Sequence, residues 1–243
     1  MTTPALAQNV KGKGRHYEHP EEGLVPSVTN IIGIMDKPAL PRWAAKMVAE
    51  RAAQMKRALP NMDDGDIVDM LKAVPWQRSG RAAERGTDIH DYLEKRLLGC
   101  EPDELSDDAR PYQAAADAWL EDRSFDDVWT ELTVFHPNYA GTVDFVARDG
   151  DLWVIGDFKT SKAIYDEAAM QLSALHNCYT QADGSPVPWR NEDGDPSGPA
   201  ELIVVRIGQD GYEEKTVADP RKSVGAFFGL LDAWHWKHEK AYL

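Results

Sequence analysis

Two aspartates and a lysine near the middle of the chain, Asp144, Asp157 and Lys159, have the side chains that metal-assisted hydrolysis of a phosphodiester requires. Such a reaction must neutralise charge on the phosphate and supply hydroxide near neutral pH, and a divalent cation held by carboxylates does both. A lysine beside the cation can orient or deprotonate the attacking water and offset the developing negative charge. An acid followed two residues later by a lysine is common on solvent-facing strands, so these residues gain meaning only from their setting.

The three residues belong to two stretches in which polar and apolar residues alternate, as expected for β-strands. These stretches are residues 141–148 and 152–159. Asp149-Gly150 between them is a strong hairpin signal. With that dipeptide as the loop, Asp144 falls opposite Ile155 and diagonal to Asp157, at roughly 7–8 Å between backbones. Lys159 shares the face of Asp157 because side chains repeat every second residue, so we expect both acids and the base on one strand face.

Helices dominate the chain before these strands. Residues 1–25 lack periodicity and are interpreted as a flexible arm. Helical spacing of apolar residues then predicts a helical region over residues 26–125, with Ser27 preceding its first helix and Gly86 weakening the centre of a later one. The expected helices span residues 27–35, 42–58, 60–74, 80–98 and 106–123.

The remaining residues, 126–243, combine strands and helices, and we expect them to form a mixed α/β core within one compact domain. The expected strands span residues 128–135, 141–148, 152–159, 201–207 and 213–217. Helices are expected over residues 164–179 and from Asp219 or Pro220 to near His238, and the Gly-, Pro- and Asp-rich residues 181–199 are expected to form a long loop. A loop of that length is often functional or mobile.

The composition limits the classes of protein to consider. With 243 residues and 42% hydrophobic content the chain can bury a sizeable core. No run of about 18 apolar residues and no apolar N-terminal stretch occurs, so we expect neither a membrane span nor a signal peptide. Lys+Arg 27 against Asp+Glu 41 gives a net charge of −14, which argues against a protein that coats nucleic acid non-specifically. Basic residues nevertheless gather in two places and would form a local rim: Lys11, Lys13 and Arg15, and Arg78, Arg81 and Arg85.

Five short motifs occur in an order that resembles the PD-(D/E)xK nuclease superfamily, in its RecB-like branch. They are Gly86-Thr87-Asp88-Ile89-His90, Glu131, Gly141-Thr142-Val143-Asp144, Asp157-Phe158-Lys159 and Gln171-Leu172. The segment Pro26–Ile32 followed by Trp43 also resembles the opening of phage exonucleases and of the mitochondrial genome maintenance exonuclease in this group. The resemblance implies a restriction-endonuclease-like core, with a central mixed sheet flanked by helices.

The resemblance also implies residue roles. Asp144 and Asp157 would bind Mg²⁺ or Mn²⁺ with the Phe158 carbonyl, and His90 would be a further ligand; an imidazole ligand predicts tolerance of Mn²⁺. Lys159 would be the catalytic lysine. Glu131 would support the catalytic site or a second metal ion, with a solvent-facing strand residue as the equal alternative. Iron–sulfur relatives carry four cysteines, whereas this chain has only Cys100 and Cys178, so no iron–sulfur cluster is expected.

DNA contacts are expected around this site. Gln171 would contact DNA or the neighbourhood of Lys159. The family often has tyrosine where this chain has Leu175, and Tyr179 is proposed as its substitute one helical turn further, with a packing role as the alternative. Thr160, Ser161 and Lys162 would bind phosphate at a helix start, and the alternative is that Ser or Thr caps the helix. Arg81 and Arg85 would touch the strand's backbone or face solvent on a helix.

These expectations give a metal-dependent DNA exonuclease that acts at DNA ends, with a single strand entering the site. Its setting would be DNA recombination, repair or replication in a bacterial cytoplasm or a phage-infected cell, where a single-strand-annealing or replication protein is a possible partner. Two alternatives remain open. The first is a structure-specific endonuclease of the same superfamily, and the second is a non-catalytic DNA-binding recombination partner.

Overall fold

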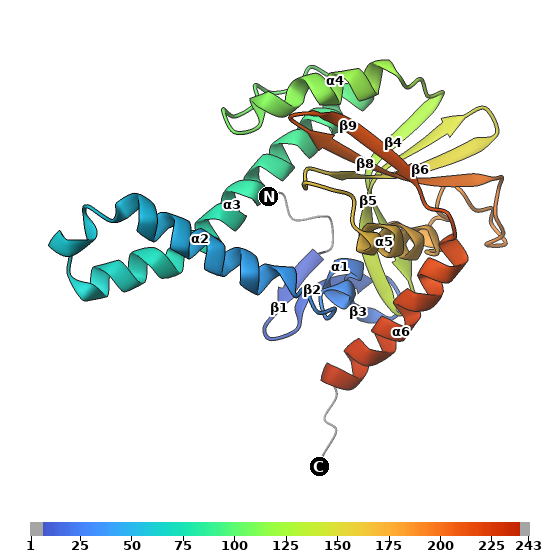
Figure 1. The fold of residues 1–243 in the computed structure, drawn as a ribbon. Helices are drawn as coiled ribbons and strands as arrows, with labels where there is room; N and C mark the ends of the chain where they lie inside the picture. Colours follow the sequence, from blue (N-terminus) through green and yellow to red (C-terminus); the bar gives the residue numbers. More distant parts are fainter. Residues whose placement is uncertain (1–6, 239–243) are drawn as a thin grey trace, which may run out of the picture.

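The computed structural model describes residues 7–238, and its main feature is a six-stranded mixed sheet (Figure 1). The strand order is β7-β4-β5-β6-β8-β9. The strands are β4 Asp127–His136, β5 Tyr139–Asp149, β6 Leu152–Lys159, β7 Thr180–Gln181, β8 Ala200–Gly208 and β9 Gly211–Thr216. Only β6 and β8 pair in parallel, and the other neighbours are antiparallel. The expected mixed α/β architecture is therefore confirmed.

Helices cover both faces of this sheet. The parallel pair needs a crossover, which α5 (Asp166–His176) supplies, and α6 (Pro220–His238) packs beside α5. Leu172 and Phe227 from these helices join Ile155 of the sheet in one apolar cluster. The end of α3 (Asp64–Leu97) and α4 (Gln113–Glu121) cover the other face, where Trp119 packs with Phe145. Burial on both faces explains the nearly continuous apolar run of β6.

The first 25 residues do not form the expected flexible arm where the structure describes them. Three antiparallel strands lie there, β1 Ala7–Val10, β2 Gly14–His19 and β3 Gly23–Pro26. Tyr17 and Val25 are buried against Phe135 and Ala140 of the large sheet, which supplies the order that local periodicity did not reveal. Residues 1–6 of the expected arm lie outside the described residues. Directly after β3, Ser27 caps α1 (Val28–Ile32), and its Oγ accepts a hydrogen bond from the Asn30 N–H at 3.0 Å.

The two helices expected over residues 60–74 and 80–98 are one continuous helix, α3, with Pro75 inside it. Its N-terminal half packs against α2 (Ala39–Met55), and the two form a hairpin that projects away from the sheet, with the short η1 (Leu59–Asn61) near its tip (Figure 1). Packing against α2 stabilises a helix that its Pro and Gly residues disfavour locally. The α4 helix begins at Gln113, after the 3-10 turn η2 (Arg110–Tyr112), and not near Ser106 as expected.

The expected long loop after α5 is anchored to the core. Two residues of the loop, Val187 and Trp189, are buried in the core. The Trp189 indole N–H donates to the His176 carbonyl at 2.9 Å. These contacts fix the segment that carries the chain from α5 to β8. Within residues 7–238, none of the helices combines the length and the apolar character that a membrane crossing needs.

Candidate metal centre

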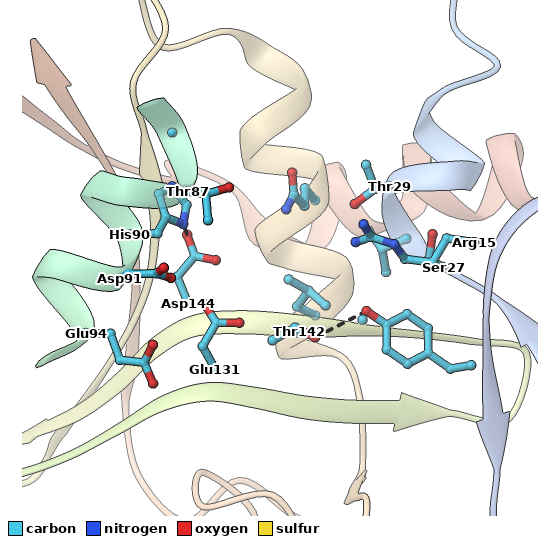
Figure 2. Close-up of a pocket in the computed structure, with 16 residues that line it drawn as sticks. Arg15, Ser27, Thr29, Thr87, His90, Asp91, Glu94, Glu131, Thr142 and Asp144 are labelled. Atoms are coloured by element: carbon cyan, nitrogen blue, oxygen red, sulfur yellow. Dashed lines mark hydrogen bonds and ion pairs between the residues drawn. The ribbon is translucent and has the colours of Figure 1, made fainter. Parts of the chain in front are cut away.

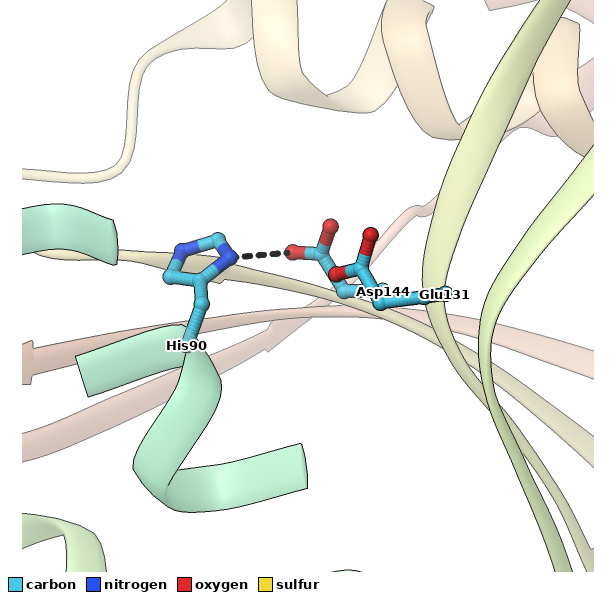
Figure 3. Close-up of side chains that lie close together, drawn as sticks. All are labelled: His90, Glu131 and Asp144. Atoms are coloured by element: carbon cyan, nitrogen blue, oxygen red, sulfur yellow. Dashed lines mark ion pairs between the residues drawn. The ribbon is translucent and has the colours of Figure 1, made fainter. Parts of the chain in front are cut away.

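Three potential metal ligands come together from three different elements: His90 from α3, Glu131 from β4 and Asp144 from β5 (Figure 3). One donor atom from each lies within 4.8 Å of the others, and His90 Nδ1 is 3.5 Å from Asp144 Oδ2. An ion at about 2.1 Å from each donor separates two donors by at most about 4.2 Å, so small side-chain movements would close the set. Carboxylates are ligands that Mg²⁺ and Mn²⁺ prefer, whereas an imidazole also suits Zn²⁺ and Fe²⁺, so the set fits a divalent cation without selecting one.

The backbone is unusual at Glu131. Its φ is 49°, which makes it the one non-glycine residue with positive φ among the described residues. The β4–β5 register is the same on both sides of it, from Thr130↔Phe145 to Leu132↔Val143. Trp129 and Leu132 pack on the same core cluster, although side chains three residues apart in a regular strand face opposite sides. Glu131 therefore changes the face that β4 presents, at a conformational cost typical of functional sites.

Beside the triad lies a second polar group around Asp157. Lys159 Nζ is 2.5 Å from Asp157 Oδ2, and the Gln171 side-chain amide donates to Asp157 Oδ1 at 3.1 Å. Lys159 also donates to Gln171 Oε1 at 3.4 Å. The two groups are linked because the Phe158 backbone N–H donates to Asp144 Oδ2 at 2.7 Å. Asp157 is thus held by Lys159 and Gln171 next to the triad.

The hairpin register differs from the expected one. Asp149 pairs with Leu152, so the turn is Gly150-Asp151 and not Asp149-Gly150. Gly150 has φ 58°, which suits it to the first turn position. The paired register ends at Phe145 and Gly156, and its continuation by one residue sets Asp144 opposite Asp157. The expected register had made these two carboxylates diagonal neighbours.

Glycines allow the helices to approach this site. A Cβ on Gly86 would lie 3.3 Å from Thr160 Oγ1, so α3 runs close to the end of β6. A Cβ on Gly141 would lie 2.6 Å from the Leu175 side chain, so that glycine makes room for α5. The glycines of the two motifs therefore bring His90 and Gln171 to the strands.

Negative charge is crowded at the triad. Although the Glu131 side chain is open to the pocket, desolvation by the surrounding walls and the charges of Asp144, Glu94 and Asp91 raise its pKa to about 7. Burial raises the pKa of Asp157, while the charge of Lys159 opposes that rise. Burial acts to lower the pKa of Lys159, but the two facing aspartates outweigh it and raise that pKa. A divalent cation would relieve this crowding.

A pocket of about 330 Å³ gives access to the triad (Figure 2). Arg15 and Tyr17 of β2 line it, and the Tyr17 hydroxyl is 3.2 Å from Thr142 Oγ1. Asp91 and Glu94 line it from α3. Sequence reasoning noted Arg15 only as a rim residue and did not single out the two acids. Their spacing from His90 on a helix, one and four residues, was a signal that could have identified Glu94.

The expected DNA contacts fall into two groups. Gln171 lines the triad pocket, whereas Arg81, Arg85 and residues 160–162 line hollows further along α3. Residues 160–162 precede α5 by several residues, and Tyr165 is its N-cap, so they neither cap the helix nor meet its first N–H groups. The expectation that these residues stand at a helix start is therefore wrong, and their contact with phosphate stays a prediction.

Tyr179 lies away from the triad. Because α5 ends at His176, helical spacing does not carry Tyr179 to the position of Leu175. Its ring lies under the Arg190 guanidinium, 4.7 Å from the centroid, and 5.6 Å from the His136 ring. Its backbone N–H donates to the Phe135 carbonyl. The structure thus gives Tyr179 the packing role that was the alternative.

Comparison with known proteins adds little to this geometry. No family model matches the chain, and no curated protein matches it. A solved structure described as "Crystal structure of SSO0001" is similar at 17% identity, over 63% of this chain and 75% of that chain, with a TM-score of 0.31. A likeness at that TM-score carries no argument about fold family or function.

Proposed function

We propose that this protein is a metal-dependent DNA exonuclease of the PD-(D/E)xK type. The observation that carries the proposal is the convergence of His90, Glu131 and Asp144 beside the buried Asp157 and its partner Lys159. These residues come from distant parts of the sequence, yet they line or adjoin a single pocket. A set of solvent-facing charges would not require a left-handed glutamate or a buried aspartate to form.

The order of elements supports a restriction-endonuclease-like core. Three antiparallel strands, β4, β5 and β6, are followed by the crossover helix α5 and the parallel strand β8. The acids lie on the three antiparallel strands, and the helix that carries His90 packs against the same sheet. Under this proposal the α2–α3 hairpin and the N-terminal sheet are additions to that core.

Each residue has a chemical task in this proposal. His90, Glu131 and Asp144 would hold a Mg²⁺ or Mn²⁺ ion, with Asp157 and the Phe158 carbonyl as the remaining expected ligands. The ion would supply charge neutralisation and a water of lowered pKa. Lys159, an ammonium held by Asp157 and Gln171, would donate to the scissile phosphate or position the attacking water. Arg15 would bind a neighbouring phosphate from the opposite side of the pocket.

The proposed substrate is DNA with a free end, and a single strand enters the site. The proposed setting is recombination, repair or replication in the cytoplasm of a bacterium or a phage-infected cell. A pocket of about 330 Å³ accommodates one strand's phosphates better than both strands of a duplex.

A nuclease assay with three substrates tests the proposal: end-labelled linear single strands, linear duplexes, and covalently closed circles. With Mg²⁺ or Mn²⁺ the chain should shorten linear DNA, and EDTA should stop the reaction. Asp144→Asn and Lys159→Ala should each lower the rate by at least about 100-fold, because each removes a group that acts on the reacting phosphate.

Matched controls separate chemistry from folding. Asp232→Asn on α6 and Lys215→Ala on β9 make the same chemical changes at exposed positions and should keep the wild-type rate. If closed circles are cleaved as fast as linear DNA, the protein is an endonuclease and not an exonuclease. Absence of cleavage of all three substrates by the folded protein, with either ion, would contradict the proposal.

A further inference from the structure

Four arginines surround a hollow on the α2–α3 hairpin, away from the triad. Arg78, Arg81 and Arg85 are spaced by three and four residues on α3 and therefore share one helix face. Arg51 of α2 lines the same hollow, whose volume is about 540 Å³. Within residues 7–238, none of the four guanidinium groups forms an ion pair.

Such an arrangement is costly without an anion. Like charges three or four residues apart destabilise a helix, and this chain has a net charge of −14, so carboxylate partners are abundant elsewhere. The Arg85 Nε atom is buried and has no hydrogen-bond partner. Two aspartates also line the hollow, but Asp107 is bound to Arg110 at 2.9 Å. The excess positive charge therefore faces the hollow.

The arginines continue into an aromatic surface. A larger hollow of about 1040 Å³ shares Arg78 and Arg85 with the first and is also lined by Trp43, Tyr112 and Tyr165. Tyr112 lies under the Arg85 guanidinium, 4.9 Å from its ring centroid. Trp43 and Tyr165 have no aromatic or guanidinium partner among the contacts of the described residues, and Tyr165 is 54% exposed. Tyr165 is therefore exposed at the hollow, and Trp43 lies partly exposed in its wall.

The hollows follow one another towards the triad, because neighbouring hollows share lining residues. Ser161 and Tyr165 line both the aromatic hollow and a smaller one that contains Lys159. That smaller hollow shares Thr29 and Gln171 with the triad pocket. Along α3, Arg85 precedes His90 by about 7.5 Å and Arg78 precedes it by about 18 Å. A strand with the stacked rise of 3.4 Å per nucleotide covers the longer distance in about five nucleotides, and a more extended strand needs fewer.

We propose that this arginine groove, formed by Arg51, Arg78, Arg81, Arg85, Trp43 and Tyr165, binds an unpaired DNA strand beyond the cleavage site. The arginines hold phosphates, and Trp43 and Tyr165 stack on bases, which a duplex does not expose. The proposal deepens the proposed function and rests on it for the identity of the ligand. It adds a site that binds the strand about five nucleotides away from the cleavage site.

Strand binding without metal tests the groove separately from catalysis. Fluorescent oligothymidylates of 3, 6, 9 and 12 nucleotides are titrated in EDTA by fluorescence anisotropy at several salt concentrations. The wild-type protein should bind the longer oligonucleotides at least about tenfold more tightly than the trimer, because only they reach Arg78. Arg78→Gln/Arg81→Gln should lose that gain and should reduce the salt slope by about 1.4, which is two phosphate contacts at about 0.7 each.

The control and the aromatic variant sharpen the result. Arg221→Gln/Lys222→Gln on α6 removes the same charge at exposed positions and should bind as the wild-type protein does. Trp43→Ala should weaken binding about tenfold, and Trp43→Phe should restore most of it, since a smaller ring still stacks. An unchanged affinity and salt slope in Arg78→Gln/Arg81→Gln would overturn the proposal. Equal loss in Trp43→Phe and Trp43→Ala would remove the stacking role.

The two proposals fail in different ways. If the protein binds longer strands more tightly but cleaves no substrate, the proposal of a strand-binding groove stands and the proposal of a nuclease is refuted. If Arg78→Gln/Arg81→Gln cleaves strands of every length with the wild-type KM, the proposal of a nuclease stands and the proposal of a strand-binding groove is refuted. Polyglutamate that competes as well as the 12-mer, together with no effect of Trp43→Ala, would show a general anion site and overturn strand recognition.

Discussion

Replacing Glu131 by glycine should stabilise the ion-free protein while it removes a ligand of the proposed ion. Glu131 has φ 49°, in the region where a Cβ atom crowds the following carbonyl. Desolvation by the pocket walls, followed by the charges of Asp144, Glu94 and Asp91, raises the pKa of its carboxyl to about 7. Glycine relieves both costs, because it has neither a Cβ atom nor a charge.

The size of the backbone effect can be separated by comparison with alanine. A left-handed non-glycine residue costs about 1–2 kcal/mol, and glycine loses about 0.5–1 kcal/mol more chain entropy than alanine on folding. Glu131→Gly should therefore exceed Glu131→Ala by about 1 kcal/mol in free energy of unfolding. In a protein of this size that difference corresponds to about 2–4 °C in melting temperature.

Thermal unfolding in EDTA at pH 8 measures this difference, because Glu131 is then mostly ionised in the wild-type protein. The expected order of melting temperature is glycine, then alanine, then the wild type. Adding Mn²⁺ should raise the melting temperature of the wild type more than that of either variant. The differences in melting temperature should therefore become smaller, or the order should invert. A stabilising substitution that removes activity is the expected signature of a strained functional residue.

Two results would refute this reasoning. Equal melting temperatures of the glycine and alanine variants would mean that the backbone at residue 131 is not strained. An ion-free wild type that is more stable than both variants would mean that the carboxylate is stabilised by neighbours, and the case for a cation at the triad would fail with it.

Further predictions concern the ion, the core and pH. Saturating Mn²⁺, at about 100 times its Kd, should stabilise the wild type by about 2.7 kcal/mol and His90→Ala by clearly less, measured by thermal unfolding; equal stabilisation would exclude His90 as a ligand. Gly156→Ala should cost more than about 3 kcal/mol, since its Cβ would lie 2.0 Å from the Phe145 ring; a normal denaturant midpoint would contradict this packing. Burial, followed by the charge of Arg190, lowers the pKa of His176 to about 4. The unfolded chain therefore binds the extra proton between pH 6.5 and 4, and the contribution of His176 alone should lower the free energy of unfolding by about 2 kcal/mol from pH 7.5 to 5. In His176→Gln that fall should shrink; an identical pH profile would assign it to other groups.

The sequence predicted the elements whose signal is local. Strands β4, β5 and β6, the crossover helix α5 and the start of α6 at Pro220 were expected within a few residues of their bounds. Hydrophobic periodicity and turn residues determine such elements, and both can be read along the chain. The N-terminal sheet was not expected, because Tyr17 and Val25 are ordered by Phe135 and Ala140, more than 100 residues away.

The site geometry required information that no local pattern holds. The hairpin was recognised, but its register shifted by one residue at the turn, which changed the partner of Asp144. The positive φ of Glu131 has no sequence signal, because glutamate does not favour that region and only the surrounding sheet imposes it. The pairing of Lys159 with Asp157 depends on Gln171 and on burial, which the spacing of two residues does not reveal.

The acidic net charge fits the two proposals taken together. A chain with a charge of −14 repels duplex DNA over most of its surface, so non-specific coating is disfavoured. The four unpaired arginines gather in one groove, and the proposed ion would add positive charge at the triad. A strand would therefore be attracted only along the path that joins these two places. Repulsion elsewhere and attraction along this path would together favour a free, unpaired end, which is the substrate that an exonuclease needs.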